Sequence, residues 1–200
     1  MSQRESVARP QPSQPSSNEK RGGIRWWLAL PLVAGALVTV SAGLAIRYMF
    51  ITTHQPQELS LFFSDTPHLK AWLSSVALAL ACFQLLTAAR IYRLLRFPPK
   101  GRFYHVVHRW SGRLAILLTL PVAFYCLFLV GVTPIDLRVS IHMALGAIVY
   151  GVFVGKVFLV RMRGFPGWAL PVAGSLLFTV LLGLWLTSAY WLFATYGVRL

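Results

Sequence analysis

Long runs of apolar residues constrain the fold of this chain more than any other feature of its sequence. A helix needs about 20 mostly apolar residues to cross about 30 Å of hydrocarbon. Apolar blocks of that length occupy residues 26–50, 69–95, 106–131, 139–160 and 168–193. The blocks are continuous, unlike the short alternating strands of a membrane barrel, and a helix satisfies its own backbone groups in lipid. The sequence therefore predicts an all-α fold, an up-and-down membrane bundle of about five transmembrane helices.

Residues 1–25 differ from the rest of the chain because they are rich in Ser, Pro, Gln and charge and have little to bury. This composition predicts a disordered basic cytoplasmic tail ahead of a transmembrane domain at residues 26–200. We favour a solvated tail that sets orientation over a partner-binding arm. Cleavage of the first block as a signal peptide is the alternative, since Val40-Ser41-Ala42 resembles a cleavage site. That block is, however, longer than the ~7–15 apolar residues of a signal peptide.

The net charge of +14 comes from 19 Lys and Arg against 5 Asp and Glu. In a soluble protein this excess would suggest a nucleic-acid partner, but here the basic residues flank the apolar blocks and no nucleic-acid motif accompanies them, so we expect none. The basic residues concentrate in the tail, between the second and third blocks and between the fourth and fifth. The positive-inside rule then predicts a multi-pass protein of the cell inner (plasma) membrane with its N-terminus cytoplasmic and its C-terminus outside.

Arg90, Arg93 and Arg96 form a basic stripe at the inner end of the second block. The expected partner is the layer of anionic headgroups at the cytoplasmic face, and an acidic soluble partner is the alternative. In the fourth block, Gly151 and Gly155 are spaced for close helix approach, which we interpret as intramolecular packing rather than dimerisation. Lys156 is either a functional charge within the span or a residue whose amine extends to the membrane–water interface.

The histidines carry the clearest hint of chemistry. His105 and His108 lie near the cytoplasmic end of the third block, His142 lies near the outer end of the fourth, and His54 and His68 lie in or beside the first outer loop. With a helical rise of ~1.5 Å per residue, the first two histidines lie most of the membrane thickness away from the other three. His108 and His142 therefore cannot both ligate one iron.

Neutral imidazole is the usual axial ligand of a haem b held between helices. An outer haem could use His142 with either His68 or Tyr125 as its second ligand, because Tyr125 is expected at the same depth. An inner haem could use His108, but His105 lies on the same helix and no other block offers a histidine at that depth. The alternative is that the histidines are interfacial. For His68 we favour the interfacial interpretation. For His108 and His142 the interfacial and haem-ligand interpretations are equally favoured.

Two resemblances follow from these motifs. His108-Arg109-Trp110-Ser111-Gly112-Arg113, followed by an apolar helix, resembles the haem-bearing helices of cytochrome b561-type and ferric-reductase-type membrane proteins. The stretch from about Tyr104 to Leu186 is more similar to an uncharacterised bacterial multi-pass membrane family, a domain of unknown function. The segments that carry this second likeness read HRWSGRLAILLTLPVAFYCLF, IHMALGAIVYGVFVGKVFLVR and GWALPVAGSLLFTVLLGLWLTSA.

The ferric-reductase likeness implies two histidines on each ligating helix, about four turns apart. That distance from His108 reaches Pro121 and Val122, and from His142 it reaches Gly155 and Lys156, so a two-haem relay is not expected. We hypothesise a b-type cytochrome-like electron-transfer protein or subunit, with electrons from an external donor or a partner membrane subunit. The alternative is a structural or assembly subunit without a cofactor, and a small-solute transporter is third. The sequence assigns no catalytic residue.

Overall fold

The computed structural model describes residues 29–52, 63, 65–95, 101–126, 136–162 and 164–199. Within these ranges every regular element is helical, which confirms the all-α prediction for this part of the chain. The elements are α1 (Leu30–Thr52), α2 (Thr66–Ile91), α3 (Arg102–Phe124), α4 (Leu137–Arg161), α5 (Ala169–Trp185), η3 (Leu186–Tyr190) and α6 (Trp191–Tyr196). The predicted tail at residues 1–25 and His54 lie outside the described residues.

Three helical stretches are long and apolar enough to cross a membrane. They are Thr66–Ile91, Leu137–Arg161 and Ala169–Tyr196, with mean hydropathies of 1.7, 2.1 and 2.0. The described apolar part of α1, Leu30–Ala45, is shorter, and α3 starts with several basic residues. The chain is therefore a membrane-type helical protein with three candidate spans, and the two further spans that the sequence predicts remain a prediction.

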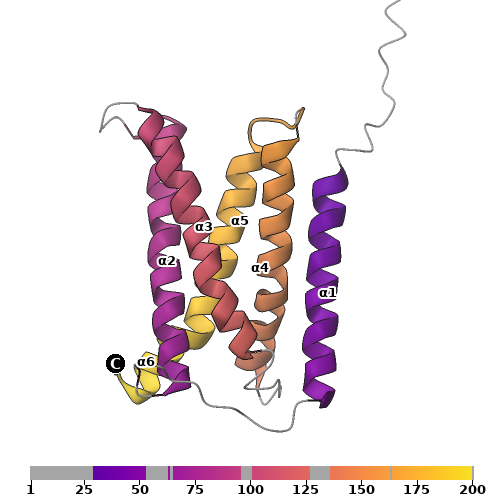
Figure 1. Ribbon diagram of the computed structural model, residues 1–200, viewed down its shortest axis with the longest axis vertical. Coiled ribbons are helices and arrows are strands. Elements are labelled where there is room, and N and C mark those ends of the chain that lie inside the picture. Colours follow the sequence, from indigo (N-terminus) through magenta and orange to yellow (C-terminus); the bar gives the residue numbers. More distant parts are fainter. Residues whose placement is uncertain are drawn as a thin grey trace, which may run out of the picture.

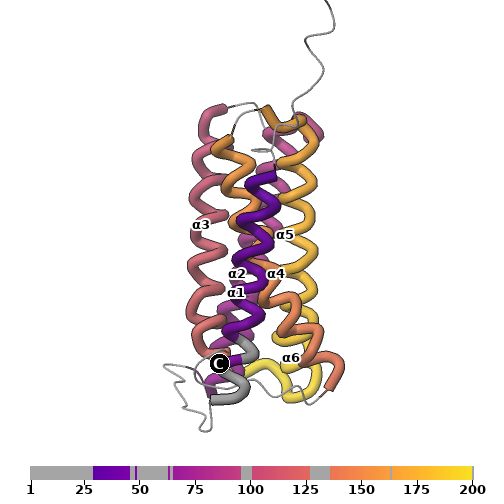
Figure 2. The backbone as a smooth tube through the Cα atoms, turned by 90° about the vertical axis from the view of Figure 1, so that its right-hand side faces the viewer, coloured from indigo at the N-terminus to yellow at the C-terminus, as the bar shows by residue number. Residues whose placement is uncertain are grey.

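The helices stand side by side along the long axis of the molecule (Figures 1 and 2). α3 packs on α2, α2 on α5, α5 on α4, and α4 on α1, so that α1 lies at one edge (Figure 1). The apolar core lies where α2, α4 and α5 meet, around Ala81, Val149, Val180 and Leu181. This order places α3 against α2 and α4 against η3.

Small residues let α1 and α4 approach closely. A Cβ added to Gly151 would lie 2.5 Å from the Gly35 carbonyl oxygen and would also overlap the Thr39 hydroxyl, and one added to Gly155 would lie 3.2 Å from the Pro31 carbonyl oxygen. These distances confirm the interpretation of Gly151 and Gly155 as intramolecular packing positions.

Five hydroxyl side chains in the described part of the chain join neighbouring helices by one arrangement. Each donates its proton to a backbone carbonyl of its own helix and lies within hydrogen-bonding distance of a polar side chain on the next helix. The pairs are Ser75 with Trp185, Thr87 with His108, Ser111 with Gln84, Thr119 with Tyr150, and Thr187 with His142.

Two segments depart from regular α geometry. Pro121, where the sequence predicts a kink, lies inside α3, which continues to Phe124 and then widens to π geometry at Tyr125 and Cys126. The second wide turn, η3, interrupts the last rod between α5 and α6, and the apolar pattern of the sequence did not predict it. Such turns are frequent at functional sites, and η3 contains Thr187.

The α1–α4 contact yields a prediction with a matched control on the same helix. Gly151→Ala should lower stability by about 1–3 kcal/mol, because the added methyl group meets backbone that cannot move aside. Gly146→Ala should be neutral or stabilising by up to about 1 kcal/mol, since nothing lies within 4 Å of its Cβ position. Thermal unfolding of the two variants in detergent measures the difference, and equal stability would contradict this packing.

Candidate functional site

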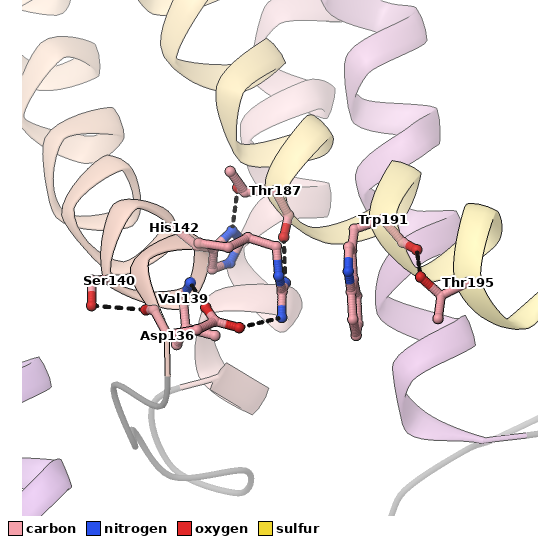
Figure 3. Close-up of polar contacts among 8 residues, drawn as sticks. Asp136, Val139, Ser140, His142, Thr187, Trp191 and Thr195 are labelled. Carbon is pink, nitrogen blue, oxygen red and sulfur yellow. Dashed lines mark hydrogen bonds and ion pairs between the residues drawn. The ribbon is translucent and has the colours of Figure 1, made fainter.

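The His142 site, which the sequence predicts to be the outer one, is built on α4 and η3. His142 Nδ1 lies 3.0 Å from Thr187 Oγ1 (Figure 3). That hydroxyl lies 2.8 Å from the Gly183 carbonyl oxygen and 3.1 Å from the Leu184 carbonyl oxygen, so its single proton is directed to its own helix. When that proton stays on its own helix, Thr187 accepts from His142 and the imidazole carries its proton on Nδ1. This tautomer leaves Nε2 with a lone pair, the form in which histidine ligates a metal.

The His108 site, which the sequence predicts to be the inner one, repeats this arrangement on α2 and α3. His108 Nδ1 lies 2.7 Å from Thr87 Oγ1, and the Thr87 hydroxyl lies 3.0 Å from the carbonyl oxygens of Phe83 and Gln84. The Gln84 amide also donates to the His108 carbonyl oxygen and, at 2.6 Å, to Ser111 Oγ. Both candidate histidines are thus held through Nδ1 by a threonine on a neighbouring helix.

Charged and aromatic side chains surround the outer site (Figure 3). The Arg138 guanidinium donates to the Thr187 carbonyl oxygen at 2.7 Å, lies 3.8 Å from the centroid of the Trp191 ring and is 3.7 Å from the Asp136 carboxylate. Asp136 also caps α4 by accepting from Val139 N at 2.7 Å. The sequence reasoning did not select Arg138. Its place one helical turn before His142 was the signal that could have identified it.

Tyr125 and His142 belong to the same half of the bundle. Tyr125 is buried at the end of α3, next to Cys126. The Lys70 ammonium on α2 lies within electrostatic range of both Cys126 and His142. Among the described residues no hydrogen bond joins Tyr125 to His142, so Tyr125 as an iron ligand remains a prediction.

His68 and His105 have separate surroundings. His68 is buried, and its ring nitrogens lie 2.7 Å from Asp65 Oδ1 and 3.3 Å from the Gly197 carbonyl oxygen. Both nitrogens are thus already engaged, in a contact between the start of α2 and the end of α6. His105 is exposed and lines a cavity at the opposite end of the bundle. Among the described residues, no three His, Cys, Asp or Glu side chains are grouped closely enough to hold a metal ion.

Polar groups also occur between the two histidine sites. The Tyr150 hydroxyl on α4 donates to α3, 3.1 Å from the Thr119 carbonyl oxygen. The Lys156 amine lies 3.8 Å from a Cβ built on Gly174 of α5 and within electrostatic range of His108. Lys156 is therefore directed toward neighbouring helices on the inner side of the bundle.

The comparisons with known proteins place the chain in a family. Residues 28–200 match the model of a family of unknown function, DUF6529. The chain belongs to this family. No curated protein and no solved structure matches it. The similarity to an uncharacterised family that the sequence predicted is confirmed, while the likeness to cytochrome b561-type proteins remains a prediction.

The cap of α2 gives a pH prediction. Burial raises the pKa of Asp65, but hydrogen bonds from the His68 backbone and ring outweigh it, and the pKa lies below its usual value. A lowered folded-state pKa contributes stability above the unfolded value of about 3.9 and loses it as pH falls through the folded value.

Asp65→Asn should keep the capping bond and lose the charge, whereas Asp65→Ala should lose both, with a cost of about 1 kcal/mol at neutral pH. In thermal unfolding from about pH 6 downward, both variants should lose less stability than the wild type on the acid side. An unchanged acid limb in Asp65→Asn would show that the carboxylate is not the titrating group.

Proposed function

We propose that this chain is an integral membrane protein that binds haem b through His142 and serves as an electron-transfer protein or subunit. The observation that carries the proposal is the contact between His142 Nδ1 and Thr187 Oγ1, which orients the imidazole and is compatible with the tautomer that has its lone pair on Nε2. Axial histidines in haem and metal proteins are commonly held in this way by a second partner.

The donor set fits a haem with one histidine ligand better than one held by two. His142 and His108 each offer an unprotonated Nε2, but His68, the outer histidine that could have been the second ligand, uses both ring nitrogens elsewhere. Tyr125 is then the candidate for the second ligand at the outer site, since a tyrosine oxygen can ligate haem iron. On the inner side, His108 would be the sole histidine ligand.

The residues around His142 have distinct tasks in this proposal. Thr187 holds the ring orientation and tautomer, and Arg138 supplies a positive charge fixed by Thr187 and Trp191 that could pair with an anionic substituent of the ligand. The apolar faces of α4 and α5 exclude water. When bound, the haem would supply one-electron exchange between ferric and ferrous iron.

The alternative function is a structural or assembly subunit without a cofactor. The same hydrogen bonds favour it, because His142 joins α4 to η3 and His108 joins α3 to α2 without any iron. A buried histidine with a hydroxyl partner can simply satisfy the polar groups of a membrane bundle. The presence or absence of bound haem separates the two functions.

A visible spectrum of the full chain, purified in detergent from haem-replete cells, tests the proposal. We expect a b-type α band in the reduced-minus-oxidised spectrum. His142→Ala should remove the absorbance that the haem bound at the outer site contributes to this band. Thr187→Val should weaken haem binding by about 10–100-fold because the ring loses its orienting partner. Thr187→Ser, which keeps the hydroxyl, should retain binding.

His105→Ala is the matched control, because this exposed histidine should leave the spectrum unchanged. His108→Ala reports on the inner site. A wild-type preparation without a Soret band would exclude the cytochrome function and favour the cofactor-free subunit. Equal spectra for the wild type and His142→Ala would exclude the outer site.

For the topology we propose five spans in the inner membrane with the N-terminus cytoplasmic, supported by the basic residues at the end of α2 and the start of α3. Because successive spans run in opposite directions, α2 and α4 would begin on the outside, at Asp65 and Asp136. Single cysteines introduced at Asp136 and at Arg102, in a chain without Cys82 and Cys126, should react with an impermeant reagent from the outside and from the inside respectively. The reverse labelling would contradict this orientation.

A further inference from the structure

A cavity of about 370 Å³ lies at the end of the bundle where α2 ends and α3 begins. This volume is at the lower end of the range of small-molecule sites. The cavity is separate from the histidine–threonine pairs. Its lining consists of Arg90, Ile91, Arg93, Gly101, Arg102, Tyr104 and His105.

Positive charge in this cavity has no acidic counterpart in the described part of the chain. Asp65 and Asp136 are the acids there, and both cap helix starts at the opposite end of the bundle (Figure 1). The ion pairs of the described residues involve neither Arg93 nor Arg102. The guanidinium groups of Arg93 and Arg102 thus share a concave site that an external anion can neutralise.

The end of α2 holds Arg93 in a backbone conformation that usually favours glycine. Arg93 has φ 65°, its N–H bonds to the Arg90 carbonyl oxygen at 3.2 Å, and Leu94 N–H bonds to the Ala89 carbonyl oxygen at 2.8 Å. These two bonds form a Schellman cap, whose left-handed position is most often Gly. A side chain is sterically disfavoured there, and this one carries a guanidinium into the cavity lining.

The two other walls of the cavity are also polar. Arg90 is only 6% exposed, bonds to the Leu95 carbonyl oxygen at 3.4 Å, and lies 5.7 Å from the centroid of the Tyr104 ring. α3 begins at the extended residue Gly101, which provides no side-chain cap. The positive end of the helix dipole and the first-turn N–H groups therefore face the same region as the arginines.

We propose that this cavity binds a phosphate monoester group, from either an anionic lipid headgroup or a free phosphate. Guanidinium groups on several sides, a tyrosine hydroxyl and a helix N-terminus offer more donors than the two oxygens of a carboxylate can accept. A phosphate monoester presents three free oxygens and nearly two negative charges. The site does not depend on haem binding and extends the function proposed above.

The test uses the full chain in detergent and measures retention of phosphatidic acid by native mass spectrometry, with phosphatidylcholine as the reference lipid. Arg93→Gly and Arg102→Gln should each weaken retention by about tenfold, which corresponds to about 1.4 kcal/mol. Arg93→Gly is informative because glycine suits the left-handed position, so its thermal stability should be unchanged or higher. A loss of binding in this variant therefore does not reflect misfolding.

Arg113→Gln is the charge-matched control, since this exposed arginine lies on α3 outside the cavity lining, and it should change retention less than twofold. Equal weakening by Arg113→Gln would overturn the proposal in favour of diffuse surface attraction, as would unchanged retention in Arg93→Gly and Arg102→Gln. Inorganic phosphate separates the two sources. Displacement of the lipid by phosphate, dependent on Arg93, indicates a free-phosphate site, and retention that phosphate does not displace indicates a lipid headgroup.

Discussion

The structure depends on one constraint, the need of polar side chains in an apolar bundle to find partners on neighbouring helices. The chain meets it with hydroxyl groups that donate to their own helix and accept from the next, as Thr187 does for His142 and Ser75 does for Trp185. Such bonds contribute only about 0.6 kcal/mol each in membrane proteins. Their directionality, rather than their strength, fixes which faces of α2, α3, α4 and η3 meet.

The same constraint gives the two histidines their chemical character. A threonine that donates its proton to its own helix accepts from the imidazole, and the imidazole that donates from Nδ1 keeps the lone pair on Nε2. A hydrogen bond that joins two helices can therefore also hold a histidine in the form that ligates a metal. This double role explains why His108 and His142 support both a cytochrome-like function and a purely structural one, which iron binding alone separates.

Charge divides the bundle along its axis. Asp65 and Asp136 cap α2 and α4 at one end, and Asp136 is joined there by Arg138. At the other end the arginines around the α2–α3 connection gather without an acid among the described residues. Acids at helix starts complement the helix dipole, so the end with Asp65 and Asp136 carries side chains of both signs, whereas at the α2–α3 end the described charged residues are all basic.

The sequence by itself determined the helical class and most of the helix positions, because block length and apolar continuity follow directly from the cost of unpaired backbone in lipid. It also placed His108 and His142 at opposite ends, since helical rise converts residue number into depth. The sequence did not reveal which side chains pair across neighbouring helices. Only the tertiary structure decided that Thr87 and Thr187 face these histidines, that His68 is occupied by Asp65, and that α2 and α3 enclose a basic cavity. Those facts depend on the rotation of each helix about its axis. That rotation is set by contacts between distant segments rather than by local pattern.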